Sequence, residues 1–354
     1  MSHVDLYDLT KPQLARWLAE REVSTSHAAR IWSYLYRELV DDVATMTDLP
    51  RAVRALLSRE ARLSTPVVAC ETAADGGDTQ KLLLQLKDDR RIETVVMRPA
   101  GRATVCVSSQ VGCPLGCVFC ATGQMGFDRN LSAGEIVSQV VFAARAVRRT
   151  ATSGGDLTST ALRNIVVMGM GEPLLNYDAV MTALEIVGDS GGLAVGFKQM
   201  TVSTVGVVPG IIRMANERRP YSLAVSMHAA TQDERAMLVP AARTWTLDEL
   251  MAACRYYTEK VGRRIFFEWT LIAGRNDSPE QAAALADLLE GVPAQVNLIP
   301  LNPTSGFAAD PTAAAALDRF HAVLRDRGLP VSIRVRRGID IAAGCGQLAV
   351  AERD

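Results

Sequence analysis

Three cysteines lie close together in the sequence: Cys113, Cys117 and Cys120 form the pattern C-x3-C-x2-C within VGCPLGCVFCATG. Soft thiolate ligands select zinc or iron–sulfur clusters, but a structural zinc site normally has four ligands, and no fourth ligand lies nearby in this sequence. Three cysteines on a [4Fe–4S] cluster would leave one iron open to a small-molecule chelate. We therefore predict such a cluster, with a degenerate zinc knuckle and three unrelated core cysteines as the alternatives.

The composition is that of an ordinary soluble protein. The chain has 354 residues, of which 48% are hydrophobic and 22% charged, and its formal net charge is -1. Nothing global indicates nucleic-acid binding, for which a basic balance is typical. No run approaches the roughly 20 apolar residues that span a bilayer, and the opening MSHVDLYDLT has no features of an export signal. We expect a cytoplasmic protein without membrane contact, whose seven cysteines are metal ligands or reactive thiols rather than a disulfide framework.

Three segments are expected to position the cysteines. Residues 1 to about 60 carry apolar side chains at helical spacing, and the segment TPVVACETAADGGDTQ then breaks the pattern. We assign residues 1–78 to a small helical accessory domain. Residues 79–101 alternate as strands do around the charged tip KDDR and form a short β-hairpin extension. From 102 to 354, strand-like runs alternate with amphipathic segments, which is the rhythm of βα units on a parallel sheet. The predicted strands are RATVCVSS (102–109), NIVVM (164–168), KQMTVST (198–204), YSLAVSM (221–227), RIFFEWTLI (264–272), AQVNLI (294–299) and a last strand, PVSIRVR (330–336).

Six βα units are too few to close an eight-stranded barrel. The predicted fold is therefore α/β, an open partial (βα)6 barrel whose site lies at the carboxyl ends of the strands. The polar run at 150–160 is predicted to be a surface loop. Three helices are predicted to begin at capping boxes, in which a Ser or Thr and a residue three positions later satisfy each other's free N–H groups. These are Ser132/Glu135, Thr246/Glu249 and Ser278/Gln281.

The cysteine pattern resembles the radical S-adenosylmethionine (SAM) signature, in which the open iron binds the amine and carboxylate of SAM. Further runs in the same order, from about Glu93 to Leu348, resemble the RlmN/Cfr family of RNA adenine methyltransferases. They are VCVSSQVGCPLGCVFCATGQMGFDRNLSAGEI, VVMGMGEPLLN, TVSTVGVVPG, VSMHA, VNLIPLNP and DIAAGCGQL. The N-terminal helices also resemble the accessory RNA-binding domain of that family. The resemblance implies a radical SAM barrel with a [4Fe–4S] cluster and two SAM molecules per turnover, one as methyl donor and one as radical source.

The resemblance also implies roles for three further residues. Carbons C2 and C8 of adenine are not nucleophiles, so a radical route supplies the reactivity that direct methyl transfer lacks. Cys345 matches the cysteine that is methylated by one SAM, converted to a methylene radical and joined to the base. Cys106 matches the thiol that releases the product by forming a disulfide with Cys345, and Glu93 matches the carboxylate that accepts the ring proton. Without the resemblance, Cys106 is an inert buried thiol and Glu93 an exposed strand residue.

A SAM-binding set is implied at the strand ends. Gly171 and Glu172 lie in a GEP turn that can aim carbonyls and a carboxylate at the SAM ammonium. The other positions lie at or just beyond predicted strand ends, where barrel sites form: Ser203, Ser226, Met227, His228 and Asn302. Met227 replaces an expected leucine, a volume-conserving change of little effect. Cys70 and Cys254 lack motif context and are assigned no chemistry.

The activity implied by the resemblance is formation of 2-methyladenosine at adenosine-2503 of 23S rRNA and at adenosine-37 of some tRNAs. One alternative is Cfr-type methylation of C8 of the rRNA nucleotide, which confers antibiotic resistance. Alternatives of another class are a non-catalytic iron–sulfur RNA-binding protein and a radical SAM activase of another protein. Flavodoxin or ferredoxin is the expected electron donor, and the protein is expected to be a monomer.

Three arginine clusters are candidate contacts for RNA phosphates, although such clusters are usually solvated faces. The third is the strongest candidate because it leads directly into the segment of Cys345. The clusters are Arg145, Arg148 and Arg149; Arg213, Arg218 and Arg219; and Arg334, Arg336 and Arg337.

Overall fold

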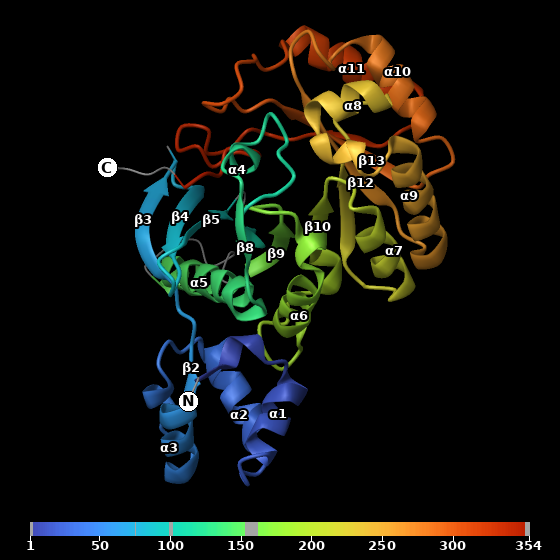
Figure 1. The fold of residues 1–354 in the computed structure, drawn as a ribbon. Coiled ribbons are helices and arrows are strands. Elements are labelled where there is room, and N and C mark those ends of the chain that lie inside the picture. Colours follow the sequence, from blue (N-terminus) through green and yellow to red (C-terminus); the bar gives the residue numbers. More distant parts are fainter. Residues whose placement is uncertain (1–2, 75, 99–101, 153–161, 351–354) are drawn as a thin grey trace.

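The computed structural model describes residues 3–74, 76–98, 102–152 and 162–350. Its main feature is a ten-stranded sheet in the order β14-β13-β12-β11-β10-β9-β6-β5-β4-β3 (Figure 1). Strands β6 and β9 to β14 are parallel, and β5, β4 and β3 continue the sheet antiparallel beyond β6. The parallel strands are β6 (Ala103–Cys106), β9 (Leu162–Val167), β10 (Met200–Thr204), β11 (Ser222–Ser226), β12 (Ile265–Leu271), β13 (Ala294–Pro300) and β14 (Val331–Ile333).

Helices on the outer face connect successive parallel strands. They are α5 (Ala133–Thr152), α6 (Tyr177–Gly188), α7 (Val208–Asn216), α8 (Gln232–Leu238), α9 (Leu247–Val261), α10 (Pro279–Leu288) and α11 (Ala314–Asp326). The sheet does not close, so the predicted partial barrel of six βα units followed by a last strand is confirmed. All three capping boxes form as predicted.

The predicted loop at 150–160 is wrong at its start. Helix α5 continues to Thr152, because the residues before the first glycine, Gly154, are all compatible with a helix. The rest of that run, 153–160, lies outside the described residues. The last strand, β14, is also shorter than the predicted 330–336, although the N–H of Arg334 still donates to the carbonyl of Leu298 at 2.8 Å.

The apolar core lies between the parallel strands and their covering helices. Strand residues such as Val105, Ile165 and Phe267 are fully buried, as expected for parallel strands covered by helices. Because parallel strands run in one direction, their carboxyl ends meet at one edge of the sheet, where the site forms. No helix in the described ranges is both long enough and apolar enough to cross a membrane.

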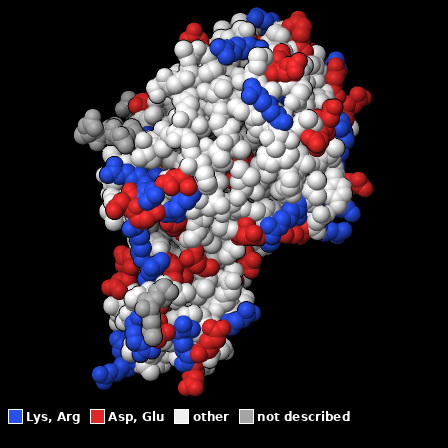
Figure 2. Space-filling view, viewed as in Figure 1, with Lys and Arg blue, Asp and Glu red and all other residues white. Residues whose placement is uncertain are grey.

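The N-terminal helices pack beneath the barrel. Helices α1 (Lys11–Ala19), α2 (His27–Ser33) and α3 (Arg51–Glu60), with the short strands β1 (Val4–Asp5) and β2 (Ala61–Arg62), lie below α5 and α6 in Figure 1. Arg145 of α5 fixes them by donating to the carbonyls of Leu39 and Val40, at 2.8 and 2.6 Å. Figure 2 shows acidic and basic side chains interspersed over this domain, while the centre of the same face of the barrel is mostly uncharged.

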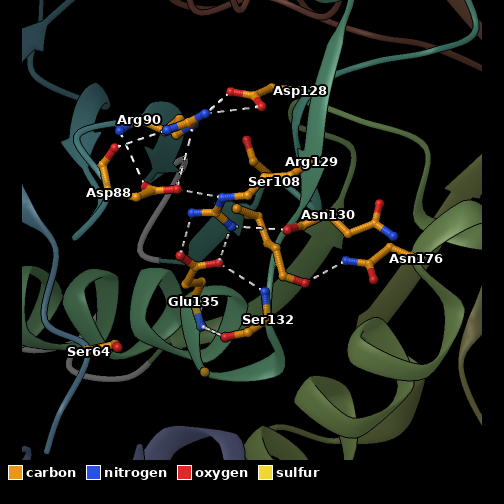
Figure 3. Close-up of polar contacts among 12 residues, drawn as sticks. Ser64, Asp88, Arg90, Ser108, Asp128, Arg129, Asn130, Ser132, Glu135 and Asn176 are labelled. Atoms are coloured by element: carbon orange, nitrogen blue, oxygen red, sulfur yellow. Dashed lines mark hydrogen bonds and ion pairs between the residues drawn. The ribbon is translucent and has the colours of Figure 1, made fainter. Parts of the chain in front are cut away.

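The antiparallel extension has three strands: β3 (Val67–Ala73), β4 (Thr79–Gln85) and β5 (Arg91–Met97). The hairpin of β4 and β5 was predicted. Strand β3 was missed, because it is an edge strand whose mostly exposed side chains give no apolar alternation. At the hairpin tip, Asp88 accepts from Arg129 of β8 (Phe127–Asn130) at 2.7 Å, and Arg90 pairs with Asp128 at 2.7 Å (Figure 3). The extension is thereby fastened to the chain that follows the cysteine loop.

Candidate active site

A pocket opens at the carboxyl ends of the parallel strands. Each of β9 to β13 contributes to its wall at or near its last residues, as the barrel fold requires. The cysteine loop and the chain's C-terminal segment complete the wall. Lining residues include Val167, Gly171, Glu172, Ser203, Ser226, His228, Glu268, Thr270, Ile299, Arg334, Cys345, Cys117 and Cys120. Among the predicted site residues, Cys113, Cys106, Glu93, Met227 and Asn302 do not line this pocket.

The cysteine loop runs between two short paired strands, β7 (Gln110–Gly112) and β8, with the single helical turn α4 (Ala121–Gln124) inside it. Gly112 has a φ of +73°, and a Cβ there would lie 2.0 Å from the carbonyl oxygen of Gly126, so only glycine lets the loop close. The N–H of Cys113 donates to that same oxygen at 2.7 Å. The loop is therefore held in shape by its own backbone.

The thiols of Cys113 and Cys117 are poor acids in this loop. Burial raises the pKa of Cys113 to about 12, and Glu172 and Cys120 raise it further. Burial also raises the pKa of Cys117 well above its usual value, and the other two cysteines raise it further. Thiolates in so dry a place need a positive partner, and a bound metal centre supplies one.

The donor set was tested against the predicted cluster. Over the described ranges, no three His, Cys, Asp or Glu side chains converge to hold a single metal ion. A zinc ion draws its thiolates to about 2.3 Å from one point, whereas in an iron–sulfur cluster different irons take different cysteines. Cys117 and Cys120 line the pocket, Cys113 lies earlier in the same loop, and the three do not converge on one point, so this donor set fits the cluster better than the ion.

Glu172 is a buried carboxyl in the pocket wall. Its oxygens accept from the N–H groups of Leu174 at 3.0 Å and Val205 at 2.9 Å, which fixes its orientation. Burial raises the pKa of Glu172 to about 7, so a cationic group placed beside it would stabilise the charged form. The preceding Gly171 has a φ of +100°, and a Cβ there would lie 2.5 Å from the Cβ of Gln110. This turn thus requires glycine.

His228 is a neutral side chain at the pocket. Its Nδ1 accepts from the N–H of Thr270 at 3.0 Å, which places the proton on Nε2. Burial, and to a lesser extent the charge of Arg235, lower the pKa of His228 to about 3. The ring packs edge-on against Phe119 of the cysteine loop, 4.7 Å between centroids. Met227, by contrast, is fully buried in the main core, so its side chain cannot contact a ligand in the pocket.

The C-terminal segment, residues 338–350, is laid across the cysteine loop. The carbonyl of Gly346 accepts from the N–H of Ala121 at 2.8 Å, and the carbonyl of Cys345 accepts from the Asn302 side-chain amide at 3.1 Å. The Oδ1 of Asn302 is buried and has no partner among the described residues. Cys345 is exposed because the pocket is open on one side, yet the protein around it raises the pKa of its thiol while Arg334 opposes the rise.

Two further candidate residues lie outside the lining of the pocket. Burial raises the pKa of Cys106 to about 12, and the charge of Cys345 raises it further. Both cysteines are free thiols. Glu93 is buried on β5 and accepts from the N–H of Ala349 at 2.9 Å. Glu93 therefore contacts the segment that carries Cys345, and Val95, two positions after Glu93, is paired with Cys106 in the sheet.

Sequence reasoning missed Glu268. Glu268 of β12 lines the pocket, accepts from the Asn297 amide at 2.8 Å and pairs with Arg334 at 3.1 Å. A charged residue inside the apolar run IFFEWTL was the signal. Arg334, a candidate phosphate contact, also lines this pocket.

Two other arginine clusters also have structural partners. Arg145 binds the carbonyls of the N-terminal domain, and Arg148 donates to the carbonyl of Arg37 at 2.8 Å. Arg213 and Arg219 pair with Glu217 on and beside helix α7. Only Arg336 and Arg337 line a groove, next to Asp78 and Thr79 of the extension. They remain candidate phosphate contacts.

Known proteins share both parts of this architecture. A family model described as the Radical SAM superfamily matches residues 107–286, and one described as the ribosomal RNA large subunit methyltransferase N-terminal domain matches residues 4–63. The chain is 56% identical to a probable dual-specificity RNA methyltransferase RlmN 2 of Opitutus terrae, over 99% of this chain and 87% of the relative. It is 50% identical to the dual-specificity RNA methyltransferase RlmN 1 of Myxococcus xanthus, over 99% and 95%.

A solved structure agrees over the whole chain. The crystal structure of a radical SAM methyltransferase from Sphaerobacter thermophilus superimposes with a TM-score of 0.91 at 46% identity, covering 98% of this chain and 99% of that one. The resemblance predicted from the motifs is confirmed by these matches. The chain belongs to the RlmN family of radical SAM methyltransferases.

Proposed function

We propose that this enzyme methylates C2 of adenosine-2503 in 23S rRNA and of adenosine-37 in some tRNAs, through an S-methylcysteine at Cys345. As a radical SAM methyltransferase of this family it uses a [4Fe–4S] cluster, and SAM serves as methyl donor and as radical source. The observation that carries the proposal is the position of Cys345. Cys345 lines the same pocket as Cys117, Cys120 and Glu172, and its charge raises the pKa of a second free thiol, Cys106.

Different residues around the pocket would bind the cluster and SAM. Cys113, Cys117 and Cys120 would hold the cluster. The carboxylate of Glu172 would bind the amine of SAM, since burial makes an opposite charge favourable there. The Nε2–H of His228 would donate a hydrogen bond. Further polar contacts would come from Gly171, Ser203, Ser226 and Asn302, and from the backbone of Met227.

The remaining residues would act on the methyl group and the base. After the methylene radical on Cys345 has added to the base, the adduct must lose one electron and one proton to restore the ring. The electron would return to the cluster, which supplies one electron for the cleavage of SAM, and Glu93 would accept the proton that the ring carbon loses. Cys106 would then attack the sulfur of Cys345. The new S–S bond forms as the S–C bond breaks, and the electron pair stays on the carbon, which takes up a proton to become a methyl group. With a pKa of about 12, Cys106 is protonated in the resting enzyme and must lose that proton first.

The RNA would approach from the side of the C-terminal segment. An adenosine must leave its stack to reach Cys345, at a cost of a few kcal/mol that is smallest in loops. Arg336 and Arg337 would contact phosphates there, because they border the groove next to this segment. A flavodoxin or ferredoxin would supply electrons to a monomeric, cytoplasmic enzyme.

Mass spectrometry tests the proposal directly. Anaerobically reconstituted protein incubated with SAM should gain a methyl group on Cys345, while a Cys70→Ser variant, which alters a thiol outside the site, should behave as the wild type. Nuclease digestion of treated 23S rRNA and tRNA should then yield 2-methyladenosine. Product methylated at C8 would instead support the Cfr-type reaction. Absence of a methyl group from every cysteine would favour a non-catalytic RNA-binding protein.

A further inference from the structure

We infer that Lys81 is a positioning residue of this active site, which orients the carboxylate of Glu93 and ties it to the segment that carries Cys345. The inference rests on the proposed function, because it concerns the proton acceptor and the methyl-carrying cysteine. Lys81 belongs to the β-hairpin, outside the barrel motifs, and lies on β4.

The sheet register places Lys81 on the reactive face. Lys81 of β4 is paired with Val95 of β5, and Val95 is paired with Cys106 of β6. Residues directly opposite each other project to the same face of a sheet, and so do residues two apart on one strand. Glu93, two positions before Val95, therefore shares this face with Lys81 and Cys106. The neighbouring side chains Leu82 and Leu84 are buried on the opposite face.

The Lys81 ammonium makes two contacts. Its Nζ lies 2.9 Å from Oε1 of Glu93 and donates to the carbonyl of Ala342 at 3.3 Å. The other oxygen of the same carboxylate, Oε2, accepts from the N–H of Ala349 at 2.9 Å. Ala342 and Ala349 flank Cys345 on either side in the sequence. The Lys81–Glu93 pair, called the clamp below, thus contacts the C-terminal segment on both sides of Cys345.

The clamp also sets the charge of the proton acceptor. Burial raises the pKa of Glu93, while the hydrogen bond and charge of Lys81 and the N–H of Ala349 oppose that rise. These two groups are the ones that face the carboxyl from β4 and from the C-terminal segment, and among the described residues no other charged group shifts it. Removing the ammonium leaves burial opposed only by one backbone N–H. Glu93 would then be protonated over a wider pH range and would accept protons poorly.

The first half of the reaction does not depend on this clamp. Cys345 is held at the pocket by the Asn302 amide, and its neighbours Gly346 and Leu348 are held by Ala121 and Thr122. Methylation of Cys345 needs no proton acceptor at Glu93. Only the later step requires the carboxylate: the ring C–H bond of the adduct gives its proton to Glu93, its electron pair restores the ring, and the one surplus electron left by radical addition would return to the cluster. If Lys81 positions Glu93, its replacement should slow only the second step. A residue needed for the fold in general should affect both steps.

The experiment compares Lys81→Met, Lys81→Arg and a matched control, Lys87→Met, at the tip of the same hairpin. Mass spectrometry measures methyl on Cys345, and single-turnover assays from about pH 5.5 to about pH 9 follow decay of the protein–RNA adduct to product. We expect normal methylation of Cys345 in all three variants. In Lys81→Met, adduct decay near pH 7 should slow about tenfold and its acid limb should move to higher pH, since one opposite charge shifts a carboxyl pKa by about one unit or more. Lys81→Arg should restore most of the rate.

Two outcomes overturn the inference. One is a wild-type pH profile of adduct decay in Lys81→Met. The other is parallel loss of Cys345 methylation and adduct decay, which would make Lys81 a structural residue only. Failure of the proposed function looks different, because wild-type enzyme would then show no methyl on Cys345 or no adduct at all.

Discussion

Two adjoining parts of the active site, the loop end and the assembled end, are built in different ways. The loop end is local: all three cysteines lie in one loop between two paired short strands. The assembled end, which contains Glu93, Cys106 and Cys345, contacts that loop through the hydrogen bond of Ala121 to Gly346. It is assembled over long distances, since Glu93 and Ala349, which hydrogen bond to each other, are 256 positions apart. Cys106 joins them from a third element, β6.

Because the two ends are built differently, they depend on different features of the chain. The cysteine loop needs its residue types, its spacing and glycines at the tight positions. The assembled end needs the register of β4, β5 and β6 and the docking of the C-terminal segment. Changes in the loop should therefore abolish cluster binding outright, whereas changes at the assembled end should leave the cluster intact and stop the reaction at particular stages.

The largest loss of activity is expected when one cysteine is replaced in each part of the site: Cys117 in the loop end and Cys345 in the assembled end. Cys117→Ser should lose its bound iron and with it all activity. Cys345→Ser should keep wild-type iron content but form no product, because the methyl carrier is gone. Iron quantification and product analysis on both variants check this. Loss of iron in Cys345→Ser would show that the two ends are not independent.

A smaller, stage-specific effect is expected at Cys106. In Cys106→Ala the adduct should accumulate and its release should slow by about a hundredfold or more, because no second thiol is in place to attack the sulfur of Cys345. Gel analysis of a covalent protein–RNA species measures this, with Cys254→Ala, another buried cysteine, as the control. Turnover of Cys106→Ala at the wild-type rate would contradict the assigned role.

The same contrast explains how far the sequence predicts the site. The cysteine loop, the capping boxes and the order of strands are encoded locally, so spacing and periodicity predict them. Glu268 and Lys81 escaped prediction because their partners, Arg334 and Glu93, become neighbours only through the register of the sheet. Motif resemblance pointed to Glu93, Cys106 and Cys345. Sequence spacing could not show that Glu93 and Cys106 share one face of the sheet, or that the segment of Cys345 contacts Glu93.

The position of Met227 makes the same point. It falls inside a run that matches the family's SAM-contacting motif, yet strand alternation turns its side chain into the core while Ser226 and His228 line the pocket. Adjacent residues of one motif therefore have different surroundings. Only their backbone groups can act at the same place.

A moderate effect on stability is expected from His228, whose ring packs against Phe119 of the cysteine loop. Its folded pKa of about 3 is below the ordinary value of 6.5, so between these values the unfolded chain binds a proton that the folded chain does not. Stability is therefore lost as the pH falls below 6.5. Between pH 6.5 and about pH 5 this linkage costs about 2 kcal/mol.

The His228→Asn variant removes this dependence. Asparagine tolerates the positive φ of 60° at this position, and its Oδ1 can accept from the N–H of Thr270. Urea denaturation at the two pH values should show the wild type losing about 2 kcal/mol more than His228→Asn. The control His27→Asn, which alters a partly exposed histidine, should match the wild type. Equal losses in His228→Asn and the wild type would mean that His228 is protonated in the folded protein.

The smallest effects are expected where the hairpin tip meets β8 (Figure 3). Arg129 binds Glu135 through two hydrogen bonds of 2.8 Å and also pairs with Asp88, and these side chains are partly buried. Arg90 pairs with Asp128 where both side chains are nearly half exposed. A shielded ion pair is stronger than an exposed one, so Arg129→Ala should cost about 1 kcal/mol and Arg90→Ala less.

Denaturant titration and iron quantification on both variants test whether the cysteine loop depends on the hairpin tip. If the tip only fastens the extension, iron content stays at the wild-type level and the two losses differ in the stated order, because the side chains differ in exposure. A loss of iron in Arg129→Ala would instead mean that the cysteine loop depends on the hairpin through β8. The local and the assembled ends would then share a support, and variants at Lys81 would have to be judged by their iron content as well as by their pH profile.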